Sequence, residues 1–250
     1  MPGGVAALLA DPGFWPLVGA GLLAGLIRGF TGFGAAMVFV PLAAIFLPPL
    51  GTIVALMVMD VGASLMLARA AFAQARLRHV AGLIAGAVLG LPLGVLLLER
   101  LDPTAFRWAA ALTSATALAL LLSGWRYRGT PGRAATVTVG GVSGFLGGFT
   151  GLGGPPVIVF FLGGPDRAMQ VRASIIAYFI ASSVLTFVVF GLRSALTAEN
   201  LAWGAALTLP FLAGTLTGTR LFARAGEAQF RGVAYAVIAG AVVLALPLWS

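Results

Sequence analysis

Two glycine-rich stretches carry the residues of this chain best suited to hold a small ion. GFTGFG occupies residues 29–34 and GFTGLG residues 148–153, 119 positions further on. Glycine allows a positive φ and lets a ligand approach the main chain closely. A helix that begins after such a break presents free N–H groups and the positive end of its dipole, which favour an anion. Thr31 and Thr150 occupy equivalent places and would add hydroxyl donors.

Two charged residues accompany the first stretch. Arg28 immediately precedes it, and Asp60 is the only acid well inside a predicted span. A charged arginine at membrane depth is energetically costly, so it indicates a functional role by default. Its planar guanidinium group can hold an anion by two parallel hydrogen bonds. Arg28 could instead form a structural ion pair with Asp60, or extend to a membrane interface. Asp60 could alternatively carry a proton as the coupling group.

Further polar residues lie near the second stretch. Arg172 and Ser174 open the span that follows it, and we interpret Arg172 as more typical of a topology-setting charge than of a ligand. Pro155 follows the glycines and suits the start of a helix, where its missing N–H is not needed. The sequence contains no cysteine and one histidine, so it offers no metal site and no bound cofactor. We expect the substrate site to draw on Arg28, Gly29, Thr31, Gly32, Gly34, Gly148, Thr150, Gly151, Gly153, Gly154, Pro155, Arg172 and Ser174, with Asp60 as the coupling candidate.

Composition places these residues in a membrane protein. The 250 residues are 60% hydrophobic and 9% charged, and the mean hydropathy is +1.05. Soluble domains carry about 25% charged residues, so this chain could not cover a water-exposed surface. The net charge is +8 and the chain has no lysine, so its positive charges are all arginines, but no aromatic-plus-basic patch of the kind that binds nucleic acid is present. The N-terminus has no basic region before its short apolar run, which argues against a cleaved signal peptide.

The apolar segments alternate between long and short. Six are near 20 residues, enough to cross about 30 Å of hydrocarbon, and the four short ones flank the glycine stretches. Two short segments placed end to end would exceed the membrane thickness, so a re-entrant hairpin fits better than a crossing. The predicted hairpins are 14–47 and 135–163, and the predicted spans are 51–72, 80–98, 106–124, 170–192, 201–222 and 231–248.

The second half of the chain repeats the first. Gly21 and Gly25 correspond to Gly140 and Gly144 at the offset of 119. At an offset of 124, residues 90–107 match residues 214–231. Internal duplication in a chain with many spans points to a transporter fold. We therefore predict an all-α polytopic membrane protein of two repeats, 1–124 and 135–250, joined by a basic cytoplasmic linker over 125–134.

Arginine positions predict the orientation of the repeats. If each hairpin turns back, each repeat crosses the bilayer an odd number of times and the two repeats are inverted. Eleven arginines then lie inside, three lie outside and Arg28 lies in the first break. Basic residues collect on the cytoplasmic side, and crossing hairpins would move five of the eleven outside. We therefore expect inverted repeats with both termini outside, and the two breaks facing each other near the midplane.

Small residues four apart predict a second role for glycine, because they let helices approach closely. We interpret the GxxxG pairs as packing faces, whereas the two GFTG clusters are interpreted as substrate site first and packing second. The pairs are Gly21–Gly25, Gly86–Gly90, Gly90–Gly94 and Gly214–Gly218.

These motifs resemble a known family. GFTGFGAAMVFVPL over residues 29–42, GGFTGLGGPPVIVFFL over 147–162 and VRAS over 171–174 are similar to the TauE/SafE family of sulfite exporters. The resemblance covers essentially the whole chain and implies export of sulfite, sulfoacetate or related organosulfonates. The sequence differs from the family pattern at Arg28, where many relatives carry an acidic residue. The signature positions that the resemblance carries over are Gly29, Gly32, Gly34, Gly148, Gly151, Gly153, Gly154, Pro155 and Pro156.

The function expected on these grounds is transport of a small anion across the cell or inner membrane. A cation or metal carrier is an alternative, although it would require several carboxylates, methionines or histidines facing a cavity. A membrane scaffold without transport is another. No HExxH, GxSxG or His/Cys cluster is present, so we do not expect an enzyme. The expected partners are the anion and the lipid bilayer, and the oligomeric state, a homodimer included, is left open.

Overall fold

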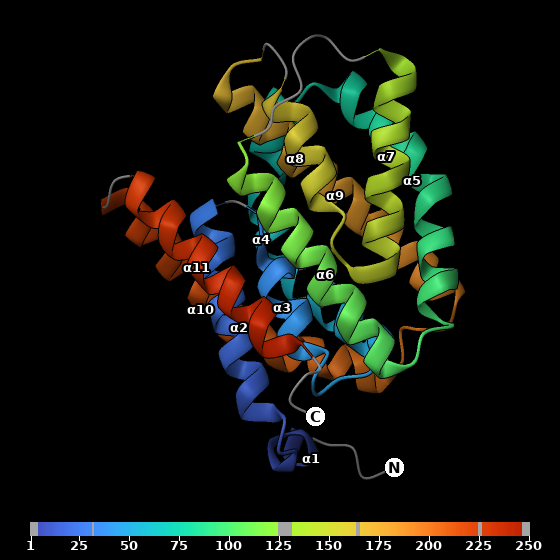
Figure 1. The fold of residues 1–250 in the computed structure, drawn as a ribbon, viewed down its shortest axis with the longest axis vertical. Helices are drawn as coiled ribbons and strands as arrows, with labels where there is room; N and C mark the ends of the chain where they lie inside the picture. The colour runs from blue at the N-terminus through green and yellow to red at the C-terminus, as the bar shows by residue number, and fades with distance from the viewer. Residues whose placement is uncertain (1–4, 32, 125–131, 164–165, 225–226, 247–250) are drawn as a thin grey trace. The chain divides into compact units, whose positions relative to one another are not determined.

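The regular structure of the chain is helical throughout the described residues. The computed structural model describes residues 5–31, 33–124, 132–163, 166–224 and 227–246. The helices, labelled in Figure 1, are α1 Val5–Ala10, α2 Phe14–Thr31, α3 Ala35–Ala43, α4 Pro49–Gln74, α5 Leu77–Leu98, α6 Pro103–Leu122, α7 Arg133–Thr150, α8 Gly154–Leu162, α9 Ala168–Leu192, α10 Ala198–Arg224 and α11 Glu227–Ala245.

Four of these helices are long and apolar enough to cross a membrane. They are Leu77–Leu98, Pro103–Leu122, Met169–Leu192 and Ala198–Leu221, and they correspond to four of the six predicted spans. Within α4 and α11 the described apolar stretches are shorter, Pro49–Gly62 and Tyr235–Ala245. The prediction of an all-helical protein with several long apolar spans is confirmed, whereas the inverted orientation of the repeats stays a prediction.

The outer faces of the long helices are apolar. Leu89 on α5, Leu192 on α9 and Leu209 on α10 expose 70%, 80% and 76% of their surface. Large leucines in such positions would lie against water in a soluble protein, at a cost of about 25 cal/mol per Å² of apolar surface. Lipid hydrocarbon around these helices removes that cost. The exposed leucines therefore indicate a membrane environment, as the mean hydropathy of the chain does.

The chain forms two compact units, and neither is a sequence half. Unit 1 comprises residues 1–63, 101–118 and 194–250, and unit 2 comprises residues 64–100 and 119–193. Each unit therefore combines segments from both halves of the sequence. Helices α4 and α6 each contribute residues to both units.

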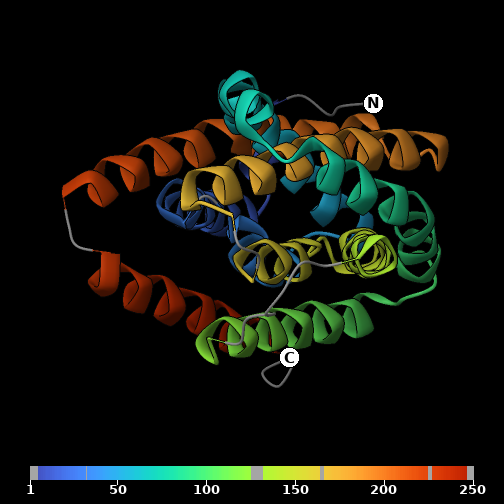
Figure 2. The same ribbon diagram turned by 90° about the horizontal axis from the view of Figure 1, so that it is seen from above.

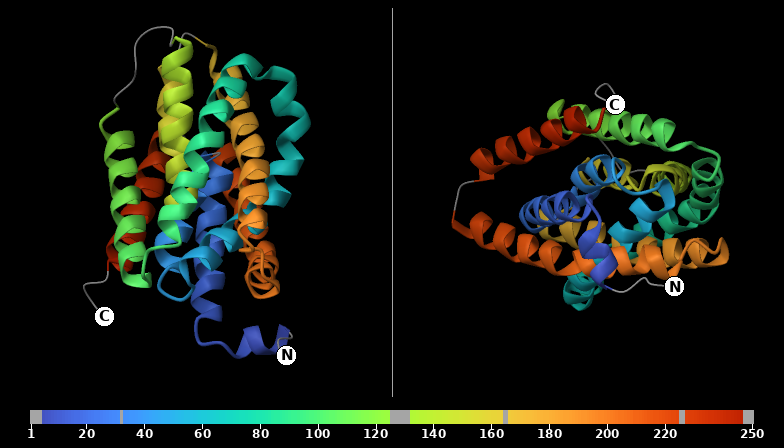
Figure 3. Two further views of the ribbon diagram at one scale, coloured as in Figure 1. Left: turned by 90° about the vertical axis from the view of Figure 1, so that its right-hand side faces the viewer. Right: turned by 90° about the horizontal axis from the view of Figure 1, so that it is seen from below.

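In unit 1, α2 and α3 pack on each other on either side of the first break, and α10 packs along α2. The views in Figure 3 show α2 in dark blue beside α10 in orange. Glycines make this contact close: a Cβ built on Gly25 would lie 2.1 Å from the carbonyl oxygen of Phe211, and one on Gly29 2.0 Å from that of Thr215. No side chain larger than hydrogen fits at either position.

In unit 2, α7 and α8 pack on each other around the second break, and α5 packs along α7 (Figure 2). A Cβ on Gly90 would lie 2.0 Å from the carbonyl oxygen of Gly141, and one on Gly94 2.2 Å from that of Phe145. The interpretation of Gly86–Gly90, Gly90–Gly94 and Gly214–Gly218 as packing faces is confirmed, because all of these glycines face backbone of a neighbouring helix.

The two glycine contacts share one register. The bounds of α2 and α7 differ by 119 residues at both ends, and so do those of α3 and α8. Gly214 faces the carbonyl of Leu22, and Gly90 faces the carbonyl of Gly141. Gly90 lies 124 positions before Gly214, and Gly141 lies 119 positions after Leu22. The offsets are those by which the sequence repeats. Each hairpin thus packs against the second long helix of the opposite sequence half.

Candidate functional site

The first break lies between the end of α2 at Thr31 and the start of α3 at Ala35. Gly34 precedes α3 with φ of 90° and ψ of −4°, a left-handed conformation that favours glycine. The predicted site position Gly32 and the side chain of Thr31 lie outside the described residues. The two helices on either side of this break, α2 and α3, pack on each other.

The start of α3 offers main-chain donors to a ligand. No side chain caps this helix. Ala35 and Ala36, in its first turn, both carry an N–H, whereas the N–H of Met37 donates to the carbonyl of Gly34 at 3.1 Å. The first N–H groups of a helix have no partner within it and add to the positive end of the dipole. This end of α3 is suited to an anion.

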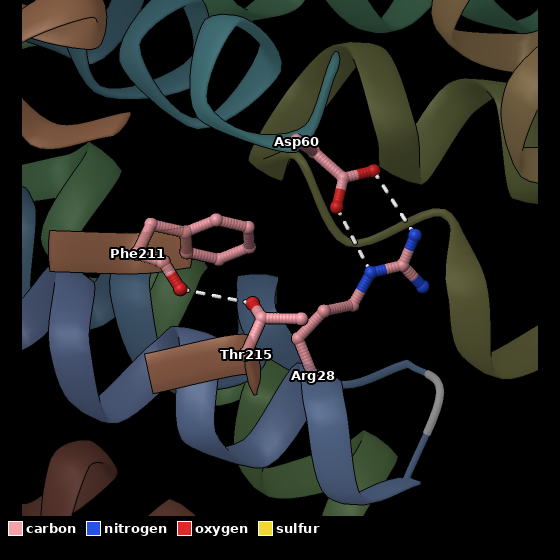
Figure 4. Close-up of polar contacts among 4 residues, drawn as sticks. All are labelled: Arg28, Asp60, Phe211 and Thr215. Carbon is pink, nitrogen blue, oxygen red and sulfur yellow. Dashed lines mark hydrogen bonds and ion pairs between the residues drawn. The ribbon is translucent and has the colours of Figure 1, made fainter. Parts of the chain in front are cut away.

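Arg28 and Asp60 form an ion pair beside the same break (Figure 4). Arg28 Nε donates to Asp60 Oδ1 at 2.9 Å, and Arg28 Nη2 donates to Asp60 Oδ2 at 3.2 Å. The Arg28 side chain is 6% exposed and that of Asp60 20%. Of the roles predicted for Arg28, the ion pair with Asp60 is confirmed. Contact with the substrate stays a prediction.

Local structure positions the arginine. Arg28 lies in the last turn of α2, where the negative end of the helix dipole favours a cation. One residue further on, Gly29 packs against α10, and its carbonyl accepts a hydrogen bond from Thr219 Oγ1 at 3.2 Å. Thr215, also on α10, donates its hydroxyl to Phe211 O within its own helix at 2.9 Å. No motif or spacing in the sequence predicted the bond from Thr219.

The second break spans residues 151–153, between α7 and α8. Gly151 caps α7 in the left-handed conformation, with φ of 74°, and its N–H donates to the carbonyl of Gly147 at 3.1 Å. This is the arrangement in which glycine commonly ends helices. α8 then starts with Gly154, Pro155 and Pro156. Because proline has no N–H, this helix end presents few main-chain donors.

Other predicted residues of the second break are occupied by packing or by local bonds. Thr150 is fully buried and donates its hydroxyl to Leu146 O at 3.1 Å, within its own helix. A Cβ on Gly148 would lie 2.3 Å from the carbonyl oxygen of Leu91, so this glycine packs against α5. Gly153 lies against the carbonyl of Ser143, and Gly154 against the Phe179 ring.

Ser174 and Arg172 lie near the start of α9. Ser174 is fully buried, donates to Gln170 O at 2.7 Å and accepts from the N–H of Arg76 at 2.9 Å. Arg76 also pairs with Asp166 at 2.6 Å. Ser174 thus ties the α4–α5 connection to α9, and the Arg76–Asp166 pair ties the same connection to the segment before α9. Arg172 is exposed, as expected of a charge that sets topology.

Sequence reasoning missed two polar residues near the second break. Ser143 on α7 and Tyr178 on α9 are buried, and their hydroxyl oxygens lie 2.7 Å apart. A tyrosine inside an apolar span was the available signal, because a buried hydroxyl there needs a partner. Among the described residues, no three histidine, cysteine or acidic side chains gather to hold a metal ion.

Long apolar helices, an apolar outer face and two broken hairpins define a polytopic helical membrane protein. Discontinuous helices in corresponding halves are a mark of membrane transporters. The family model described as sulfite exporter TauE/SafE matches residues 17–245, and the chain belongs to this family. It is therefore a multi-pass membrane transporter and not an enzyme. No curated protein and no solved structure matches the chain.

Proposed function

We propose that this transporter carries a small anion such as sulfite or an organosulfonate, bound at its glycine-rich helix breaks. The observation that carries the proposal is the start of α3, where main-chain donors of an uncapped helix lie within two residues of a positive-φ glycine. Such an end attracts negative charge through its N–H groups and its dipole. Membership of the sulfite exporter family supports the same sign of charge.

Arg28 supplies a second recognition element. Its guanidinium already holds two oxygens of the Asp60 carboxylate through Nε and Nη2. A sulfite or sulfonate group presents a similar pair of oxygens, and arginine binds such pairs through its planar fork. In this proposal the anion competes with Asp60 for the fork, which keeps the arginine neutralised in the empty and the loaded protein.

The membrane potential sets the direction. Moving one charge across 100 mV is worth about 2.3 kcal/mol. With the inside negative, export of an anion is downhill and needs no coupling ion, so export by uniport is the simplest mechanism. Import would need a proton or Na⁺, for which Asp60 is the candidate group. The proposal keeps the location in the cell or inner membrane, the inverted repeats and the outside termini expected from the arginine distribution.

Flux into proteoliposomes tests the proposal. Purified protein is reconstituted, and uptake of sulfite, sulfoacetate and thiosulfate is followed under an imposed voltage, with protein-free liposomes and divalent cations as controls. We expect saturable anion flux that follows the voltage. Absence of flux for every anion under every voltage or pH gradient would refute the proposed function, and flux of cations alone would replace it with a cation carrier.

A further inference from the structure

Tyr178 is the largest fully buried side chain among the described residues. It lies on α9, inside a candidate membrane span, and 1% of its surface is exposed. Its hydroxyl lies 2.7 Å from Ser143 Oγ on α7. Ser143 is likewise 1% exposed, so the contact is shielded from solvent. Buried hydroxyl groups are retained where they form hydrogen bonds, because burial without a partner is costly.

The hydrogen bonds at Ser143 have a defined direction. Ser143 Oγ donates its proton to the carbonyl oxygen of Gly153. A serine hydroxyl has one proton, so the bond between Ser143 and Tyr178 must use the proton of Tyr178. The result is a chain of hydrogen bonds from Tyr178 through Ser143 to the main chain of the break.

The carbonyl that receives this chain belongs to the last residue of the second break. Gly153 precedes α8, and no side chain caps that helix. Pro155 and Pro156 have no N–H with which to anchor the start of α8. Phe179, the neighbour of Tyr178, lies against Gly154, 3.1 Å from the position of a Cβ there. Two consecutive residues of α9 therefore brace two consecutive residues at the start of α8.

Among the described residues, the first break has no corresponding pair of hydroxyl groups on α2 and α4. The positions 119 residues before Ser143 and Tyr178 are Ala24 and Met59, which cannot form it. The Arg28–Asp60 pair joins α2 to α4 there, and the positions 119 residues after this pair are Gly147 and Phe179. Each break is thus braced by the long helix that follows its hairpin, by charges in one case and by neutral hydroxyls in the other.

We propose that Tyr178 is a positioning residue for transport: through Ser143 it fixes the Gly153 carbonyl and thereby the shape of the second break. This inference rests on the proposed function, since the break is taken to form part of the anion site. Tyr178 acts on the main chain and need not touch the anion. Its loss should therefore weaken apparent substrate affinity more than the maximal rate of correctly folded protein.

The test compares Tyr178→Phe and Ser143→Ala with wild type in the sulfite flux assay. Phenylalanine keeps the ring that fills the site, and alanine at Ser143 provides a second variant should the first fold poorly. We expect each variant to raise KM about three- to tenfold, the effect of losing one hydrogen bond, with the maximal rate within about twofold. The double variant should be no worse than either single variant, and Ser143→Thr, which keeps a hydroxyl, should restore KM.

Thr116→Val is the control, because its exposed hydroxyl bonds only Leu112 O of its own helix, at 2.8 Å. An unchanged KM in both test variants, or an equal rise of KM in Thr116→Val, would overturn the inference. Hydrogen exchange over residues 151–154 separates it from the proposed function. If wild type carries no anion, the proposed function fails, and faster exchange at this break in Tyr178→Phe still supports the positioning role, whereas unchanged exchange refutes it.

Discussion

The first and second breaks share a plan and differ in chemistry. Both follow an 18-residue helix, α2 or α7, and both precede a nine-residue helix, α3 or α8. The first is braced by an ion pair and opens into a helix start with free N–H donors. The second is braced by hydroxyl groups and opens into two prolines. The helix plan thus recurs, whereas the charges and the free N–H donors do not. Under the proposed function, this difference favours anion recognition chiefly at the first break and a positioning role at the second.

Removing one member of the Arg28–Asp60 pair should have the largest effect. Asp60→Leu leaves the buried guanidinium without its carboxylate, and the loss of one partner of a buried pair costs about 3–5 kcal/mol. Thermal unfolding in detergent, followed by tryptophan fluorescence, measures the loss. The double variant Arg28→Met/Asp60→Leu should recover most of the stability, because apolar side chains replace both charges, yet it should lose sulfite flux.

That double variant decides what the charges contribute. Wild-type flux in a stable Arg28→Met/Asp60→Leu protein would show that the pair is only structural and takes no part in anion recognition. A double variant as unstable as Asp60→Leu would instead show that both charges have further partners in the fold.

Adding a methyl group at a glycine contact should destabilise the fold by a similar amount in each of the two units. Gly90→Ala and Gly214→Ala each place a Cβ about 2 Å from a carbonyl oxygen of the neighbouring helix, 2.0 Å and 2.2 Å respectively. Overpacking of this kind costs about 1–3 kcal/mol, and rigid backbone has little freedom to relax. We expect both variants to lower the unfolding midpoint by similar amounts.

Gly19→Ala is the matched control for these variants. No atom lies within 4 Å of the new Cβ, and alanine favours helix over glycine, so stability should hold or rise. Clearly unequal losses in Gly90→Ala and Gly214→Ala would contradict the shared register of the two contacts.

Exchanging the helix starts should change affinity rather than folding. Ala36 in α3 corresponds to Pro155 in α8, 119 positions later. Ala36→Pro removes one N–H from the proposed anion site, at a position where α8 already tolerates proline. A hydrogen bond to a charged group contributes about 1.5–3 kcal/mol, so KM for sulfite should rise at least tenfold. The reverse change, Pro155→Ala, should leave KM nearly unchanged, and a large effect there would move recognition to the second break.

The smallest effect concerns an ion pair at the ends of two spans in unit 2. Arg193 Nε donates to Glu99 Oε1 at 2.9 Å, and this hydrogen bond lowers the pKa of Glu99. A lowered pKa stabilises the fold above the unfolded pKa, and the gain is lost as the pH falls through the folded pKa. Wild type should therefore lose slightly more stability than Glu99→Gln when the pH falls from 7 to 3. Parallel unfolding midpoints would show that the exposed pair contributes nothing.

Much of the helical layout could be predicted from the sequence. Predicted spans 51–72 and 170–192 lie within two residues of α4 and α9 at both ends, because apolar runs bounded by polar or glycine residues mark helices in lipid. Glycine-rich breaks were expected at 29–34 and 148–153. Helices α2 and α7 extend to Thr31 and Thr150, so each interruption comes only after the first three residues of its stretch. The helix α1 was not expected, because its six residues are too few to show a periodic pattern.

The partners of each helix could not be predicted. Spacing marked Gly25 and Gly90 as packing residues, but nothing local indicates that Gly25 meets Phe211 or that Gly90 meets Gly141. For the same reason the pairing of Arg28 with Asp60 was one of three alternatives. The bond from Tyr178 to Ser143 was missed, since its members lie 35 residues apart on different helices. Predicting such contacts needs the tertiary arrangement, which a pattern of residue types does not contain.

The contact between α2 and α10 has a consequence for biosynthesis. α2 ends at Thr31 and α10 begins at Ala198, so the partner of the first hairpin leaves the ribosome long after the hairpin itself. Until then Gly25 and Gly29 have only lipid or an insertion factor to cover them. The amino-terminal half should therefore be a target for membrane proteases when it is made alone, and co-expression with the carboxy-terminal half should rescue it.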